Sequence, residues 1–379
     1  MIAMALRNLS CLCLSPNSFI CNPNVLSIHF FSTARAKRLI IPSPEIYDML
    51  LHKHQFSPEL AALASSRLPK FRSPKRADSV LSFLKENSFT TTQLQKLVIY
   101  NPRILGFTIK SLESRFKVFQ DLGLSSEEIA KIISSYQVIL HSCMASKIIP
   151  SLSMLKALLG SNEEVARLLK KCAWFLRSDL EKTLMPNVEI LKSCSIPMER
   201  ILQFLYTRPR CFLVRPDIMR KSVDRAVEYG ISRTSTGFIH ALGVFSSTSE
   251  GMWDVKLETL RNLGFSDVDI FTMFRKQPNV YSASAKTMKN KIEFLLTTKK
   301  YNISNIVTYP VALMCSIEKR LELRMQILRL LESRNLIEKW PTLSTLSIST
   351  DDKFFDGFVR PYCDEIGQEY IAKICQAQR

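Results

Sequence analysis

The sequence contains very little glycine, with 10 residues among 379, against a usual share of about 7%. A fold with many tight β-turns needs more glycine, because glycine supplies the positive φ angles of such turns. Hydrophobic residues make up 46% of the chain, which excludes general disorder. The composition therefore favours helices joined by short connections.

Two further features are missing. No run of 18 or more apolar residues occurs, so we expect no membrane-spanning helix. None of the 10 cysteines forms a C-x-x-C pair, and no glycine-rich phosphate loop is present. Because no combination of nucleophile, base and orienting group emerges either, we expect no metal, no cofactor and no enzymatic activity.

Negative charge is also scarce relative to positive charge. The chain has 52 Lys and Arg against 34 Asp and Glu, a formal net charge of +18. Such an excess repels itself and is typical of proteins with a polyanionic partner. An anionic membrane surface would be met more naturally by one basic amphipathic helix than by charge spread along the chain. We therefore expect nucleic acid as the partner.

Residues 1–38 contain no acidic side chain. A basic, acid-free and serine-containing segment is typical of an organelle transit peptide, with a disordered tail as the alternative. Phe30–Ala34 favours a plant mitochondrion, and a chloroplast is the second choice. The four basic residues in this segment leave +14 of the +18 charges in the remaining chain.

A tetrad of similar residues recurs at steps of 32–36 residues. The tetrads begin at Pro102, Gln137, Ala173, Pro209, Gly243, Pro278 and Pro310. In phase with them, turns such as Gly123–Ser125 close one apolar-periodic stretch and cap the next. Proline ends a helix because it lacks an N–H and restricts the residue before it. Each repeat is thus predicted as a long helix, a Gly–Ser turn, a short helix and a proline-centred break.

Local patterns support helices on both sides of the turn. We predict capping boxes that pair Thr90 with Gln93, Ser125 with Glu128 and Ser161 with Glu164. One long helix has an apolar stripe at steps of 3 and 4, formed by Ile109, Leu112, Phe116, Phe119 and Leu122. We expect three aromatic residues of the tetrads, Trp174, Phe175 and Phe245, to pack in the core.

Two helices cannot bury their apolar faces alone, but stacked neighbours can. We therefore predict an all-α superhelical solenoid of about seven helix-turn-helix repeats of about 35 residues, occupying residues 77–337. Residues 39–76 would form an N-terminal extension with a basic linker, and residues 338–379 a C-terminal cap.

These repeats resemble the mitochondrial transcription termination factor (mTERF) family, and its plant branch most of all. The resemblance rests on the Pro-x-x-Leu-like tetrads and on Ser79–Lys85, Leu97–Leu105, Phe274–Pro278, Tyr309–Pro310 and Ser316–Leu321. It covers roughly residues 78–360. Gln137, Ala173 and Gly243 depart from it by replacing the tetrad proline.

The resemblance implies an all-helical half-ring of mTERF-type repeats with a basic face. Members bind double-stranded DNA or RNA in mitochondria or plastids. They act in transcription termination, transcript maturation, intron splicing or ribosome assembly. By this resemblance the partners would be organellar DNA or RNA and other gene-expression proteins, and we expect a monomer.

Basic residues recur 9–14 positions after the start of every tetrad. We predict that they line a path for phosphates and bind nucleic acid. They are Arg115, Lys147, Lys182, Arg220, Lys221, Lys256, Lys289, Lys291, Arg320 and Arg324. A solvated helix face is the alternative for each, and the stem of Arg115, beside the apolar stripe, would then cover the core.

Two functions remain open at this point. The first is an organellar nucleic-acid-binding protein that regulates mitochondrial gene expression, by transcription termination or regulation or by transcript processing and splicing. The alternative is an α-solenoid scaffold that binds proteins in an organellar ribonucleoprotein or ribosome-assembly complex. The net charge favours the first, because a scaffold does not need it.

Overall fold

The computed structural model describes residues 44–67 and 74–366. Within these ranges the secondary structure is helical throughout, with no strand, which confirms the predicted all-α class. No helix of the described residues is long and apolar enough to cross a membrane. The predicted transit peptide at 1–38, most of the basic linker and residues 367–379 lie outside the described residues. The half-ring and the domain boundaries stay predictions.

Long and short helices alternate along the chain. The long helices are α4 (Pro74–Glu86), α6 (Ile109–Gln120), α8 (Ile149–Leu159), α10 (Leu184–Ser193), α12 (Pro216–Glu228), α14 (Glu250–Asn262), α16 (Ala285–Thr297) and α18 (Glu322–Ser333). The short helices are α5 (Thr91–Tyr100), α7 (Ser126–Ser135), α9 (Asn162–Lys171), α11 (Met198–Thr207), α13 (Thr236–Phe245), α15 (Asp267–Lys276), α17 (Ile303–Thr308) and α19 (Leu343–Ile348). One long helix and the short helix after it make one repeat.

A 3-10 turn follows most of the short helices, and we call it the corner turn. The corner turns are η2 (Pro102–Gly106), η3 (Gln137–His141), η5 (Ala173–Leu176), η6 (Pro209–Leu213), η7 (Pro278–Ser282) and η8 (Pro310–Met314). Single π-helical turns, η4 (Met144–Ile148) and η9 (Ile317–Leu321), lead into α8 and α18.

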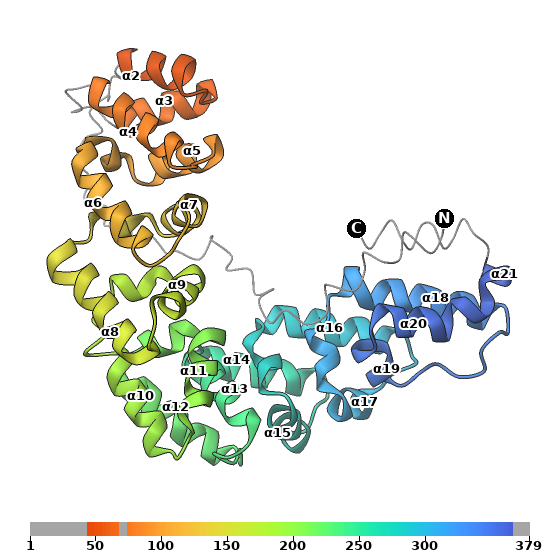
Figure 1. Ribbon diagram of the computed structural model, residues 1–379. Helices are drawn as coiled ribbons and strands as arrows, with labels where there is room; N and C mark the ends of the chain where they lie inside the picture. The colour runs from red at the N-terminus through yellow and green to blue at the C-terminus, as the bar shows by residue number, and fades with distance from the viewer. Residues whose placement is uncertain (1–43, 68–73, 367–379) are drawn as a thin grey trace, which may run out of the picture. The chain divides into compact units, whose positions relative to one another are not determined.

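The described residues form two compact units. The N-terminal unit comprises residues up to 188 together with 208–213, and the C-terminal unit comprises 189–207 and 214–366. Within the N-terminal unit the short helices α5, α7 and α9 contact one another in order, beside the column of α4, α6 and α8 (Figure 1). Within the C-terminal unit α14 contacts α16, and α15 contacts α17. Repeats therefore stack on their sequence neighbours, as predicted.

The break before a corner turn does not depend on proline. Asn101 and Gln277, which precede prolines, have φ of −141° and −147°. Tyr136 and Cys172, which precede Gln137 and Ala173, leave the helix with φ of −142° and −154°. The tetrad at 243 differs, because α13 continues through it to Phe245 and has no corner turn. The predicted break in the helix is therefore present at six tetrads, but only four of these six begin with proline.

The Gly–Ser turns that end in Ser125, Ser161 and Ser266 form as predicted and cap the next helix, whereas α13 is capped by Ser235 and not by Ser232. Four turn glycines have φ between 74° and 92°, and Ser195 takes the same left-handed region at φ 60°. Full capping boxes are confirmed at Thr90 and Ser125. The predicted box at Ser161 is only half present, because Ser161 accepts from the Glu164 N–H while the Glu164 carboxylate pairs with Arg167 at 3.0 Å.

Further helices flank the array. Helix α2 (Pro44–Asp48), the π-helical turn η1 (Met49–Lys53) and α3 (Pro58–Ser66) precede α4, in a segment for which no repeat was predicted. After α19 come α20 (Asp351–Phe358), the 3-10 turn η10 (Arg360–Tyr362) and α21 (Cys363–Ile366).

His54 joins the first helices to α4. Its side chain is 1% exposed, and its Nε2 lies 2.9 Å from Oδ1 of Asp78. Burial lowers the pKa of His54 below 6.5, and the hydrogen bond with Asp78 opposes that shift only in part. Burial alone would raise the pKa of Asp78. The hydrogen bonds from Lys53 and His54 outweigh this effect and lower the pKa below 3.8. Asp78 therefore stays ionised at mildly acidic pH while His54 resists protonation.

Because the folded chain disfavours the proton on His54, the unfolded chain binds it more readily. The contribution of the neutral His54 to the free energy of unfolding should be fully present above about pH 6.5 and should fall as the pH decreases through that value. We expect thermal unfolding followed by circular dichroism to show a smaller loss of stability between about pH 7.5 and 5.5 in His54→Gln than in the wild type. The exposed neighbour His52, changed to Gln, is the matched control, and an equal pH dependence in all three proteins would contradict this role.

Candidate nucleic-acid interface

Half of the ten predicted cations are exposed. They are Lys147, Lys182, Arg220, Lys221 and Lys289. Lys182 has a side chain that is 82% exposed and pairs with Asp179 at 3.3 Å, and Lys289 lies 3.7 Å from Glu293. Such exposed pairs contribute little to stability, so these ammonium groups remain available to phosphates.

The other five cations are buried or half-buried and bind their own chain. Nε of Arg115 donates to the carbonyl of Leu140 at 2.9 Å, and the guanidinium lies over the Phe107 ring. Nζ of Lys256, in a side chain that is 3% exposed, donates to the carbonyl of Tyr281 at 2.5 Å.

Lys291 and Lys256 share one environment. Nζ of Lys291 donates to the carbonyl of Leu313 at 2.8 Å. Burial lowers the pKa of both lysines, because the charged form loses hydration. Each ammonium thus donates to the carbonyl of the next-to-last residue of a corner turn.

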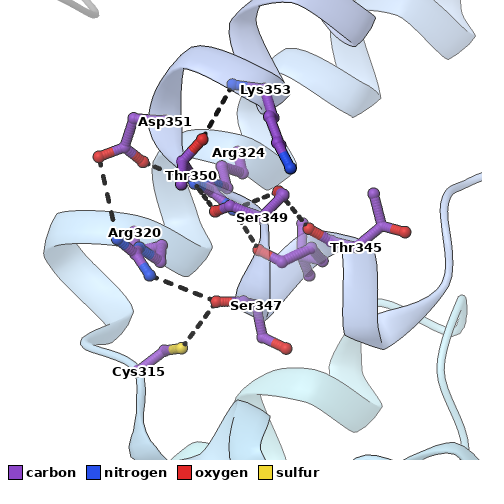
Figure 2. Close-up of polar contacts among 10 residues, drawn as sticks. Cys315, Arg320, Arg324, Thr345, Ser347, Ser349, Thr350, Asp351 and Lys353 are labelled. Atoms are coloured by element: carbon purple, nitrogen blue, oxygen red, sulfur yellow. Dashed lines mark hydrogen bonds and ion pairs between the residues drawn. The ribbon is translucent and has the colours of Figure 1, made fainter. Parts of the chain in front are cut away.

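Arg324 is buried beneath the segment that joins α19 to α20 (Figure 2). Its guanidinium donates to the carbonyls of Leu346 and Ser349, each at 2.8 Å, and pairs with Asp351 at 2.6 Å. Arg320 lies beside it and donates to the carbonyl of Ser347 at 3.3 Å (Figure 2). These arginines hold the end of α19 and the residues after it against η9 and α18.

The sequence pattern did not separate these two groups. Counting from the tetrads placed all ten cations in one class, although five lie on the buried side of their helices. The available signal was the apolar stripe, because Arg115 lies between the buried residues Leu112 and Phe116. A cation at a stripe position points into the core whatever its distance from a tetrad.

Charge is distributed unequally between the two ends of the repeats. We call the fourteen residues that begin three before each tetrad the corner segments, and together they form the corner edge of each unit. They are 99–112, 134–147, 170–183, 206–219, 240–253, 275–288 and 307–320. They contain 15 Lys and Arg against 5 Asp and Glu, whereas the six segments between them contain 17 against 15. The positive excess is therefore concentrated where short helices end and long helices begin.

The opposite edge, at the Gly–Ser turns, carries acids for a structural reason. Glu128 and Asp269 complete capping boxes, and Asp267 pairs with Arg261 at 2.7 Å. Acidic groups are favourable at helix N-termini, where they meet free N–H groups and the positive end of the helix dipole. Caps thus place acids at one edge and leave the other edge basic.

Corner turns of successive repeats touch within each unit. In the N-terminal unit the Asn101 side chain donates to the carbonyl of Gln137 at 3.4 Å and lies 2.8 Å from Nε2 of His141. In the C-terminal unit Gln277 contacts the sulfur of Met314. Side chains of neighbouring corners therefore form one surface in each unit.

An aromatic stack lies on this surface in the N-terminal unit. The rings of Tyr136 and Trp174 stack with centroids 5.3 Å apart, and the Arg210 guanidinium lies 4.5 Å from the Trp174 centroid. Phe175 and Phe245 are buried as expected, but Trp174 is 39% exposed, so the core position expected for it was wrong. Its neighbours in the tetrad, Phe175 and Leu176, fill the core instead, because the three residues of one 3-10 turn point in three different directions.

Comparison with known proteins agrees with this architecture. A family model described as mTERF matches residues 33–176, 111–229 and 239–355. The chain belongs to the mTERF family. It is also similar to a protein of Arabidopsis thaliana called transcription termination factor MTERF8, chloroplastic, with 19% identity over 253 residues. That match covers 66% of this chain and 43% of the relative, so the chain spans less than half of the relative's length. The predicted resemblance to the family and its plant branch is confirmed.

For this mTERF protein we expect Arg324→Met to lower the free energy of unfolding by about 2–4 kcal/mol. The substitution leaves the carbonyls of Leu346 and Ser349 without their donor and Asp351 without its nearest cation. Chemical denaturation of the purified protein measures the loss.

The matched control is Arg329→Met on the same helix. That side chain is 51% exposed and lies 3.7 Å from Glu322, so its removal should change the free energy by at most about 1 kcal/mol. Equal losses in the two variants would show that Arg324 does not hold the residues after α19.

Proposed function

We propose that this mTERF protein binds double-stranded DNA or RNA along its corner edges and regulates gene expression in a plant organelle. The observation that carries the proposal is the segregation of charge: 15 cations against 5 acids in the corner segments. Phosphates bind where lysine and arginine side chains are exposed without an equal number of acids. Lys147 and Lys182 are exposed at this edge, and Arg220, Lys221 and Lys289 lie just beyond the corner segments.

The organelle and the regulated step are part of the proposal. Family membership and the relative's name support transcription regulation or termination, and transcript processing and splicing are the other steps we consider. The acid-free residues 1–38 support import into an organelle. The relative's name supports a chloroplast, whereas the residues Phe30–Ala34 favour a mitochondrion. A fluorescent fusion of the full chain in plant cells distinguishes the two.

A protein-binding scaffold is the second candidate. It is favoured by Met252 and Val255 on α14, which are 55% and 54% exposed and lie one helical turn apart. A scaffold acts without binding phosphates, so its function would not depend on the corner cations. The two candidates therefore differ in how binding responds to salt.

The corner edge can be tested with two triple variants on the same three repeats. Lys110, Lys147 and Lys182 lie at or just before the starts of α6, α8 and α10, and Lys117, Lys156 and Lys192 lie near their ends. We expect the first triple, changed to Gln, to weaken binding to duplex DNA or RNA. It should also reduce the slope of log affinity against log salt by about 0.9 for each phosphate that the variant no longer neutralises.

The second triple carries the same change in net charge and is the control. It should leave the salt slope within error of the wild type, because these lysines lie at the Gly–Ser edge. Equal effects in the two triples would mean that only net charge matters. A wild type that shows no salt-dependent retention on heparin would favour the scaffold.

Trp174 should report binding at the corner edge of the N-terminal unit. Of the three tryptophans, Trp253 is buried at 2% exposure, whereas Trp174 is 39% exposed beneath Arg210. We expect nucleic acid to change the Trp174 fluorescence, because phosphates would draw Arg210 away from the ring. The change should disappear in Trp174→Phe at unchanged affinity for the nucleic acid. A change that persists in this variant would place the bound nucleic acid elsewhere.

A further inference from the structure

A polar residue occupies the same position in seven successive long helices or the turns that lead into them. This set, which we call the polar ladder, consists of Arg115, Ser151, Asn187, Ser222, Lys256, Lys291 and Arg324. Its members are 33–36 residues apart, and each is buried or half-buried. Helix α4 departs from the pattern, because the residue 25 positions before Leu105 is the buried Val80.

Five members of the ladder make the same hydrogen bond. Arg115, Lys256 and Lys291 donate to the fourth residue of the next tetrad, and Arg324 donates to Leu346 in α19. Asn187, with no exposed surface, donates to the carbonyl of Phe212 at 3.1 Å. Because a neutral amide replaces the cations here, the position requires a hydrogen-bond donor and does not require a charge.

The two serines occur where this bond is absent or the corner is altered. Ser222 lies before α13, which has no corner turn, and its hydroxyl donates instead to Ile218 in its own helix at 2.8 Å. Ser151 lies before η5, which has four residues where the other corner turns have five. Among the ladder residues before Arg324, the donor side chain thus follows the presence of a full corner turn, whereas Arg324 donates to α19.

We propose that the polar ladder positions the corner edge, and that its cations do not contact nucleic acid. This inference rests on the proposed function. Four of these bonds fix the carbonyl of the next-to-last residue of a corner turn, and the cations of the corner segment follow within a few residues. Leu313, held by Lys291, comes six residues before Lys319. Loss of the bond leaves a buried carbonyl unpaired, so the corner shifts and the exposed cations lose their spacing.

Lys291 and Lys289 give a matched test on one helix, because Lys289 is exposed two residues away. The variants are Lys291→Met, Lys291→Arg and Lys289→Met in the chain from residue 39 onward and in the full chain. Three quantities are measured: thermal stability, hydrogen exchange of residues 310–316, and binding of a random-sequence DNA duplex across a salt series.

For Lys291→Met we expect the melting temperature to fall by about 2–5 °C and exchange at 310–316 to accelerate about tenfold. At temperatures well below melting, affinity should fall about 3–10-fold with an unchanged salt slope. Lys291→Arg should restore all three, because Arg115 and Arg324 make the same bond. Lys289→Met should keep stability and exchange, and should reduce the slope by about 0.9 if it contacts one phosphate.

Three results would overturn the inference. A reduced salt slope in Lys291→Met would make Lys291 a phosphate ligand. Unchanged exchange and stability would show that the bond does not hold the corner. Faster exchange with unchanged affinity would limit the ladder to folding. If the wild type binds no duplex, the proposed function fails, and the positioning role fails with it. Hydrogen exchange of residues 310–316 still decides in that case whether Lys291 holds the corner turn.

Discussion

Six described repeats end in a corner turn, and at four of these turns a side chain of the preceding long helix donates to the carbonyl of the buried fourth tetrad residue. A 3-10 turn leaves its final C=O groups without partners inside the turn. The preceding long helix supplies the partner from a side chain that lies 22 or 25 residues earlier in sequence, as with Lys291 and Leu313 or Asn187 and Phe212. A buried carbonyl without such a partner would cost about 1–3 kcal/mol. One polar residue in five of the long helices therefore ties its helix to the next corner turn or to α19.

The same constraint explains why the cations of this chain fall into two groups, one bound to the backbone and one exposed to solvent. A lysine or arginine in the apolar stripe, such as Lys256, gives its hydrogen bonds to the backbone. A cation outside the apolar stripe, such as Lys182 just before α10, is exposed to solvent. Helix caps place acids at the other end of the repeat. The corner edge is therefore basic because of where each charge lies in the repeat and because of how many charges the chain has.

The helices, their caps and their stacking could be predicted from the sequence, because they depend on local periodicity and on Gly–Ser turns such as Gly123–Ser125. The continuation of α13 through Gly243 could not be predicted, since Gln137 and Ala173 also stand in place of proline and yet begin corner turns. In the candidate site, the direction of the side chains was the feature that the sequence predicted least well. Lys289 and Lys291 are two residues apart, and counting from Pro278 does not separate them, although only Lys291 lies on the apolar face of α16 that packs against η8 and is half-buried. Trp174 escaped prediction for the same reason.

The central claim is that nucleic acid lies along the corner edges. Ultraviolet crosslinking of the full chain to a bound duplex, followed by mass spectrometry of the crosslinked peptides, tests it most directly. We expect crosslinks in the corner segments, with 99–112 and 170–183 prominent in the N-terminal unit, and few in the Gly–Ser segments 113–133 and 148–169. Crosslinks concentrated in the Gly–Ser segments, or spread evenly over both edges, would contradict it.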